Sequence, residues 1–264
     1  MHRRPLGKTG LSLSPIGFGA FKIGRNQNTK YPSQYQLPDE SAVGLLLNAC
    51  LDLGINYIDT AAAYGASEER IGQAISHRRT EFVLSTKAGE FFENGQSRYD
   101  FSRAAIEESV RGSLSRLRTD RVDLLLLHAN ADDLHVVTQT DAVATLRDLK
   151  AAGQARFIGL SAKTDEAARA AMDWADALML DYSIQDRSHE AVIAEASRRG
   201  IGVIAKKGLG SGHLNAEAAI EFVLANQHIS SLLVGSLNIE HLAQNVRCGW
   251  SVEWDERSEG PPCE

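Results

Sequence analysis

The feature that most constrains this chain is a regular alternation of short apolar runs with longer segments of helical periodicity. Eight apolar runs bounded by turn residues are predicted as strands, over residues 16–19, 57–59, 82–87, 124–128, 156–161, 177–180, 202–206 and 232–235. Eight helices are predicted between and after them, over residues 39–53, 68–76, 102–116, 141–152, 164–172, 188–199, 216–226 and 238–246.

Eight strand–helix units in 264 residues match the (β/α)8 TIM barrel, an α/β fold, in both count and length. A doubly wound sheet usually has fewer units and a phosphate-binding fingerprint, and residues 17–22 fail as that fingerprint because Lys22 replaces its third glycine. We therefore expect one barrel domain over residues 1–264. It should include a short N-terminal β-hairpin near residues 4–13, a catalytic-face loop at 24–37 and a frayed tail at 251–264.

Composition and charge exclude several classes of protein. The formal net charge is -6 and no block of Lys and Arg occurs, so we expect no nucleic-acid partner and no binding to an anionic membrane surface. The longest apolar runs, such as 124–127, are far shorter than the roughly 20 residues of a membrane helix, and the polar start is unlike a signal peptide. These features predict a soluble cytoplasmic protein.

The cysteines carry no predicted chemistry. Cys50, Cys248 and Cys263 are odd in number and lack CxxC spacing, which argues against a disulfide framework and against a zinc site. The His128–His135 loop, with its two aspartates, lacks a partner at recognisable ligand spacing, so we expect no catalytic metal.

Ionisable residues stand where three consecutive predicted strands end. Asp59, Lys87 and His128 should converge at one mouth of a barrel, because the C-terminal ends of its strands meet there. Taken singly, Asp59 can cap a helix, Lys87 can extend its ammonium to solvent, and His128 can be a core histidine. Their joint placement favours a site. Tyr64 follows Asp59 by five residues, close enough to return its hydroxyl over the mouth.

These four side chains can act together as a general acid. A phenol has a pKa of about 10, and a neighbouring ammonium such as that of Lys87 stabilises its anion. Asp59 would offset the cost of holding that ammonium away from water, and His128 would hydrogen-bond a carbonyl oxygen beside Tyr64. No Ser or Cys nucleophile is evident, so an external hydride is the natural complement. The pattern predicts carbonyl reduction.

Residues 54–65, with Ser67-Glu68 and Ile71-Gly72 after them, closely resemble the signature of the aldo-keto reductase superfamily. Further similar stretches are 84–87, 122–128, 153–161 and 234–245, so the resemblance spans nearly the whole chain. It implies that Tyr64 is the general acid, that Lys87 and Asp59 tune it, and that His128 orients the carbonyl. It also implies a small carbonyl substrate and NADP(H) or NAD(H) extended across the mouth, in a monomer or small homo-oligomer.

The resemblance also implies a set of cofactor-binding positions: Gly19, Ala20, Ser161, Ala162, Met179, Lys206, Gly208, Leu209, Ser211, Gly235, Ser236, Leu237, Asn238, His241, Gln244 and Asn245. Ala162 and Met179 stand where family members usually have the Asn and Gln that hold the nicotinamide carboxamide. Lys206 replaces an aromatic residue that usually stacks on the ring. Its stem can cover the ring, its ammonium can bind a pyrophosphate or an anionic substrate, or it can point outward.

The choice between NADP(H) and NAD(H) stays open. Gly235 and His241 stand where many members have the Lys and Arg that face the 2′-phosphate, which leaves Ser236, Asn238 and a helix N-terminus as donors. Gln244 and Asn245 resemble a pair that contacts adenine, although they can equally form a polar surface.

Phe21 and Phe91 are candidates for the substrate pocket, or they pack a lid. Three hypotheses follow: a nicotinamide-dependent carbonyl reductase, a lyase or isomerase that uses the same acid without a hydride cofactor, and a non-catalytic NAD(P)-binding sensor. The complete set of four residues favours the reductase.

Overall fold

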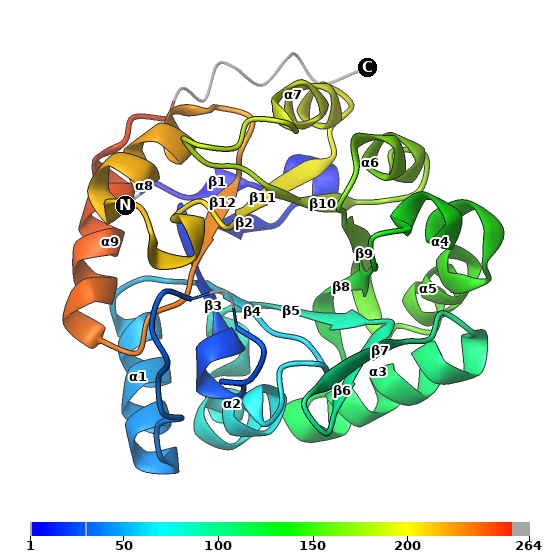
Figure 1. Ribbon diagram of the computed structural model, residues 1–264, viewed down its shortest axis with the longest axis horizontal. Coiled ribbons are helices and arrows are strands. Elements are labelled where there is room, and N and C mark those ends of the chain that lie inside the picture. Colours follow the sequence, from blue (N-terminus) through cyan, green and yellow to red (C-terminus); the bar gives the residue numbers. More distant parts are fainter. Residues whose placement is uncertain (1, 30, 255–264) are drawn as a thin grey trace.

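Eight parallel strands close into a barrel in the computed structural model, which describes residues 2–29 and 31–254 (Figure 1). In barrel order they are β3 (Ile16–Gly19), β4 (Tyr57–Asp59), β5 (Val83–Ala88), β8 (Val122–His128), β9 (Ala155–Ser161), β10 (Ala177–Asp181), β11 (Gly202–Lys206) and β12 (Ser231–Val234). β12 pairs with β3 and completes the ring. The predicted (β/α)8 barrel and its eight strands are confirmed.

The helices form an outer ring around the strands (Figure 1). They are α1 (Glu40–Asp52), α2 (Ser67–Ile75), α3 (Arg103–Leu117), α4 (Asp133–Gln139), α5 (Ala142–Ala151), α6 (Asp165–Ala171), α7 (Glu190–Arg198), α8 (Ala216–Ala225) and α9 (Ile239–Ser251). Side chains cap several N-termini: Asp39, Ser102 and Thr164 each accept a hydrogen bond from the backbone N–H three residues on. These caps explain why the predicted helix starts lie within about two residues of the observed ones.

A β-hairpin and a short α-helix were not predicted. The hairpin of β6 (Glu90–Glu93) and β7 (Gln96–Tyr99) follows β5, and the helix α4 follows β8. Both are too short for their periodicity to stand out in a sequence. Four short 3-10 helices also occur, η1 (Gly7–Thr9), η2 (Ala20–Ile23), η3 (Ser76–Glu81) and η4 (Gly210–Gly212).

The predicted loop and tail are partly as expected. The described residues of 24–37 contain no helix or strand, as predicted; residue 30 lies outside the described residues. The last helix was predicted to end at residue 246, but α9 continues to Ser251, because Val246 and Gly249 on its buried face still pack on the barrel. Residues 255–264, predicted to be frayed, lie outside the described residues.

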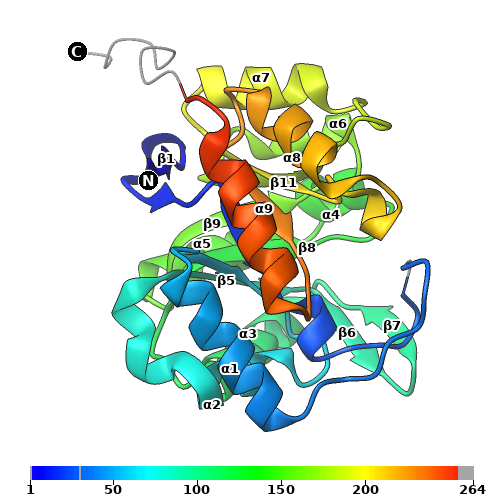
Figure 2. The ribbon, with the colours of Figure 1, turned by 90° about the vertical axis from the view of Figure 1, so that its left-hand side faces the viewer.

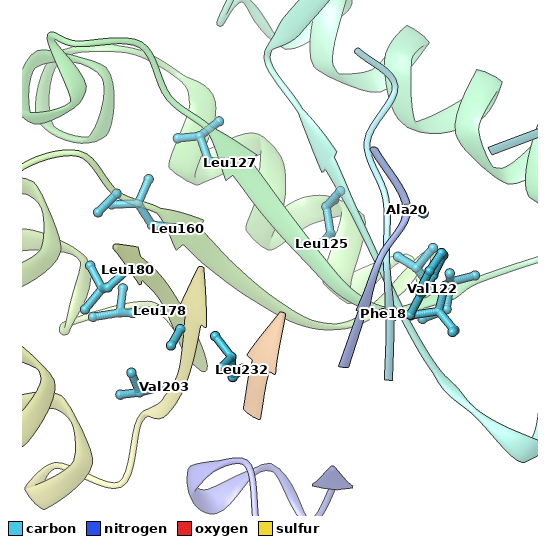
Figure 3. Close-up of a cluster of buried hydrophobic side chains, with 14 of the residues drawn as sticks. Phe18, Ala20, Val122, Leu125, Leu127, Leu160, Leu178, Leu180, Val203 and Leu232 are labelled. Carbon is cyan, nitrogen blue, oxygen red and sulfur yellow. The ribbon is translucent and has the colours of Figure 1, made fainter. Parts of the chain in front are cut away.

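Strand side chains alternate between the barrel interior and the surrounding helices. On β8, Leu124 and Leu126 belong to the interior cluster, whereas Leu125 and Leu127 belong to the larger cluster under the helices. Figure 3 shows members of the outer cluster, including Leu160 on β9, on their strands. The apolar run predicted as one strand is therefore buried on both faces, as parallel barrel strands are.

The N-terminal hairpin closes one end of the barrel. β1 (Arg4–Pro5) pairs with β2 (Ser12–Leu13), as predicted, and lies apart from the helical ring in side view (Figure 2). Leu6, Leu11 and Leu13 pack with the interior residues of the barrel strands. The end closed by the hairpin is the N-terminal end of the strands, so the opposite end is left for a site.

Truncating one buried side chain of the N-terminal hairpin should destabilise the barrel. Leu13 is fully buried, so we expect Leu13→Ala to lower the free energy of unfolding by about 2–5 kcal/mol, through lost burial and a residual cavity. Leu45→Ala is the matched control, since Leu45 is 67% exposed on α1 and should change stability little. Urea unfolding of both variants measures the free energy of unfolding. Equal losses of stability in the two variants would contradict a stabilising role for the buried leucines of the hairpin.

Candidate active site

Strand register brings four ionisable side chains to the C-terminal mouth of the barrel. Asp59, Lys87, His128 and Lys206 each lie an even number of residues after an inward-facing apolar residue of the same strand, so the pleat turns them to the same side. They line one pocket of about 270 Å³, which also includes Tyr64. The predicted convergence of Asp59, Lys87 and His128, with Tyr64 beside them, is present in the structure.

Asp59 and Lys87 form a buried ion pair under the pocket. Lys87 Nζ donates to Asp59 Oδ2 at 2.5 Å and to the Thr60 carbonyl at 2.8 Å, and the two charged side chains are only 1% and 4% exposed. The other carboxylate oxygen of Asp59 accepts from Ser85 Oγ at 2.7 Å, and that hydroxyl lies 2.9 Å from the Tyr57 hydroxyl. Every partner of the pair is thus fixed by the barrel.

Tyr64 reaches the mouth from a tight loop after β4. The Tyr64 N–H donates to the Ala61 carbonyl, and the Ser67 N–H donates to the Tyr64 carbonyl, which turns the chain back toward the barrel. The loop rests on Gly24, where a Cβ atom would lie 2.1 Å from the Tyr64 carbonyl oxygen, so a larger residue there would displace the loop. Phe21 packs edge-on against the Tyr64 ring at 5.0 Å.

Lys87 and Tyr64 are electrostatically coupled. The Lys87 ammonium lies 4.8 Å from the centroid of the Tyr64 ring. Burial raises the pKa of Tyr64, and the charge and hydrogen bond of Lys87 oppose this rise. Burial by itself lowers the pKa of Lys87, but Asp59 and Tyr64 outweigh it and the pKa is raised. Lys87 therefore stays an ammonium and favours the phenolate form of its neighbour.

His128 stands beside Tyr64 and contacts a carboxylate that the sequence analysis missed. Its ring centroid is 5.9 Å from that of Tyr64, with the planes at 83°. Its Nδ1 atom lies 3.0 Å from Glu90 Oε2, at the start of the unpredicted β6. An acidic residue directly after the Lys87 strand and Gly89 was the only signal in the sequence.

Lys206 faces the pocket from β11. Its Nζ donates to Ser161 Oγ at 2.8 Å and to the Ala162 carbonyl at 3.2 Å, and lies 3.7 Å from Asp181. Burial lowers the pKa of Lys206 to about 7; Asp181 opposes the shift, while the nearby lysines add to it. The side chain does not point outward, which was one of its predicted alternatives.

Six of the predicted cofactor positions line this pocket: Gly19, Ser161, Met179, Lys206, Ser211 and Gly235. The predicted substrate residue Phe21 also lines it. Further lining residues, not among the predicted site positions, are Asn28, Thr29, Tyr31, Lys163, Lys207 and Leu233. Two glycines, three serine or threonine hydroxyls and three lysines thus surround the space above the ion pair.

The other predicted positions lie outside the pocket lining: Ala20, Ala162, Gly208, Leu209, Ser236, Leu237, Asn238, His241, Gln244, Asn245 and Phe91. Gly208 faces the core, where a Cβ atom would lie 2.6 Å from Leu232. Asn238 caps α9 by accepting hydrogen bonds from the Glu240 and His241 backbone N–H groups. These N–H groups at the helix N-terminus, which were predicted to bind the cofactor phosphate, therefore already have a partner. Phe91 instead lies under the Arg98 guanidinium on the hairpin.

Within residues 2–29 and 31–254, no group of three or more His, Cys, Asp or Glu side chains is arranged to hold a metal ion. No helix in those ranges is long and apolar enough to cross a membrane.

Comparison with known proteins decides the family. The model of the Aldo/keto reductase family matches residues 15–218, most of the barrel. This chain belongs to the aldo-keto reductase family. The family membership expected from the sequence is confirmed. Members of this family are oxidoreductases that use NAD(P)H.

Solved structures and curated proteins place this aldo-keto reductase among its relatives. PA4992 from Pseudomonas aeruginosa superposes with a TM-score of 0.86 at 41% identity, covering 94% of this chain and 93% of that one. The holo form of the aldo-keto reductase AKR11C1 from Bacillus halodurans gives 0.82 at 26% identity, covering 98% and 94%. NADH-specific methylglyoxal reductase of Escherichia coli K12 is 31% identical over 207 residues, 72% of this chain and 61% of that protein.

Proposed function

We propose that this protein transfers hydride between NAD(P)H and the carbonyl carbon of a small aldehyde or ketone, with Tyr64 as the general acid. The observation that carries the proposal is the buried Asp59–Lys87 pair beneath the Tyr64 ring, in a pocket shared with His128. Nicotinamide supplies the hydride when it is bound. The chain supplies the proton and the orientation.

The proton moves at the Tyr64 hydroxyl. As negative charge develops on the substrate oxygen, Tyr64 donates its proton, and the resulting phenolate is stabilised by the Lys87 ammonium. Asp59 keeps that ammonium charged and in place. His128, whose ring packs edge-on against the ring of Tyr64, orients the reacting oxygen of the substrate. In the direction of alcohol oxidation the same phenolate accepts the proton.

The lining of the pocket offers groups that suit part of a dinucleotide. Gly19 has no atom closer than 3.9 Å to a Cβ position, so the backbone there is open to a ligand. Lys163, Lys206 and Lys207 place positive charge beside the mouth, which suits phosphate groups. Ser161 and Ser211 add hydroxyls. The fit is altered at one point, because Ser161 Oγ already accepts a hydrogen bond from Lys206.

Calorimetric titration with NADPH, NADH and their oxidised forms tests the proposal before any substrate is known. We expect micromolar or tighter binding at pH 6. Because the pKa of Lys206 is about 7, its ammonium is present below pH 7 and lost above it, so affinity for the anionic cofactor should be weaker at pH 8.

The variant Lys206→Met is the control for that pH dependence, and its affinity should be the same at both pH values. Absence of binding by every form of the cofactor would contradict the reductase proposal and leave the cofactor-free reaction. Equal pH dependence in the variant and the wild type would contradict the role assigned to Lys206 and would leave the reductase proposal standing.

A further inference from the structure

The side-chain nitrogen of Lys206 donates two hydrogen bonds at the edge of the pocket. Nζ donates to Ser161 Oγ at 2.8 Å and to the Ala162 carbonyl at 3.2 Å, and the side chain is only 14% exposed. Asp181 Oδ1, at 3.7 Å, is beyond hydrogen-bond distance and has no hydrogen-bond partner among residues 2–29 and 31–254. Two donated bonds use both N–H groups of a neutral amine and leave its lone pair for another group.

Charged side chains from several strands act on the Lys206 amine. Burial lowers its pKa most, and the cations of Lys163 after β9, Lys207 after β11 and Lys87 on β5 lower it further. Asp181 on β10 opposes these effects, and the pKa is about 7. At pH 7 about half of the molecules therefore carry a free amine at this position, against on the order of one in 10³ for an ordinary lysine.

The Lys206 amine shares its pocket with the proposed general acid. Lys206, Tyr64 and His128 all line the cavity of about 270 Å³ at the C-terminal mouth of the barrel. Strand register supports their closeness, because Ser161, which accepts from Nζ, is the direct partner of His128 between β8 and β9. A desolvated amine beside other cations is a nucleophile, and a proton donor in the same pocket completes what addition to a carbonyl group requires.

We propose that Lys206 is a nucleophile that forms an imine with small aldehydes and ketones in this pocket. Its lone pair attacks the carbonyl carbon and forms the C–N bond, while the carbonyl oxygen takes a proton from Tyr64. The C–O bond of the resulting carbinolamine then breaks, and the oxygen leaves as water. Both hydrogens of that water come from the amine by way of the Tyr64 hydroxyl, so nothing is oxidised or reduced. This reaction goes beyond the hydride transfer proposed above and needs no nicotinamide.

Reductive trapping of the wild-type protein detects the imine. The protein is incubated at pH 7 with acetaldehyde and sodium cyanoborohydride, which reduces an imine to a stable N-ethyl lysine. Mass spectrometry of the peptides then gives the rate of labelling at each lysine. We expect Lys206 to be labelled about tenfold faster or more than Lys150, a lysine whose side chain is 37% exposed. The reason is that the free amine is far more frequent at Lys206 than in an ordinary lysine.

A second lysine of the pocket is the internal control. Lys87 lines the same cavity, but its ion pair with Asp59 keeps it an ammonium, so it should stay unlabelled. Labelling of Lys206 no faster than that of Lys150 would overturn the proposal. The reaction mixture contains no NAD(P)H, so failure of the reductase proposal, seen as no cofactor binding, is separable from failure of the Lys206 assignment.

The variant Tyr64→Phe tests the proton donor of the imine reaction. Loss of the hydroxyl should slow the labelling of Lys206 by about 10²-fold, the lower end of the contribution of a positioned acid, and leave the labelling of Lys150 unchanged. Tyr99→Phe removes a hydroxyl that does not belong to the pocket lining, so its labelling rates should equal those of the wild type. Equal rates at Lys206 in the wild type and in a folded Tyr64→Phe would overturn the pairing of Lys206 with Tyr64.

Discussion

Tyr64→Phe should lower kcat for carbonyl reduction by about 10²–10⁴-fold, the contribution usual for a positioned general acid. The ring contacts with Phe21 and His128 survive this change, since only the hydroxyl is lost. The fold and the affinity for NADPH should therefore be unchanged. Steady-state kinetics with a small aldehyde, together with cofactor titration, measures both.

Tyr99→Phe is the matched control for that experiment. It removes the same hydroxyl from a tyrosine that is 39% exposed on β7 and does not line the pocket. Its turnover should equal that of the wild type. A Tyr64→Phe enzyme that retained a tenth or more of wild-type turnover would refute the assignment of Tyr64 as the acid.

Lys87→Met should unfold much more easily than the wild type. Removing the ammonium leaves the Asp59 carboxylate buried with no opposite charge, which costs about 3–5 kcal/mol in comparable pairs. Turnover should fall as well, because the Tyr64 phenolate loses its stabilising charge. Urea unfolding gives the first quantity and kinetics under folding conditions gives the second.

The double variant Asp59→Asn, Lys87→Met separates the two effects. With both charges removed, no uncompensated ion remains in the barrel, so we expect most of the lost stability to return. Turnover should stay low, because no ammonium faces Tyr64. If activity returned together with stability, the pair would be structural and Lys87 would have no part in proton transfer.

Much of the fold was predictable because its signals are local. The predicted strand 124–128 begins with an apolar run, 124–127, which is typical of a strand covered on both faces. Helix starts at Asp39, Ser102 and Thr164 are marked by their own capping side chains. The β6–β7 hairpin escaped prediction because its exposed polar residues carry no strong alternation of burial.

In the candidate site, too, the residues with local signals were predictable and the others were not. Asp59, Lys87 and His128 were predictable because each ends a strand, and parallel strands of a barrel all end at one mouth. Glu90 was not, because its relation to His128 depends on how a hairpin folds back over a neighbouring strand. The positions along 235–245 were expected at the cofactor, but most of them lie outside the pocket lining.

By itself, then, the sequence determined the number and order of the barrel strands and of the eight longer helices between them, and the identity of the residues that end those strands, because periodicity and turn chemistry act over a few neighbours. Tertiary structure alone decided which nitrogen of His128 meets a carboxylate and where the Lys206 ammonium is bonded. Those are contacts between residues 38 and 45 positions apart, and their distances are set by barrel closure and loop packing rather than by local preference.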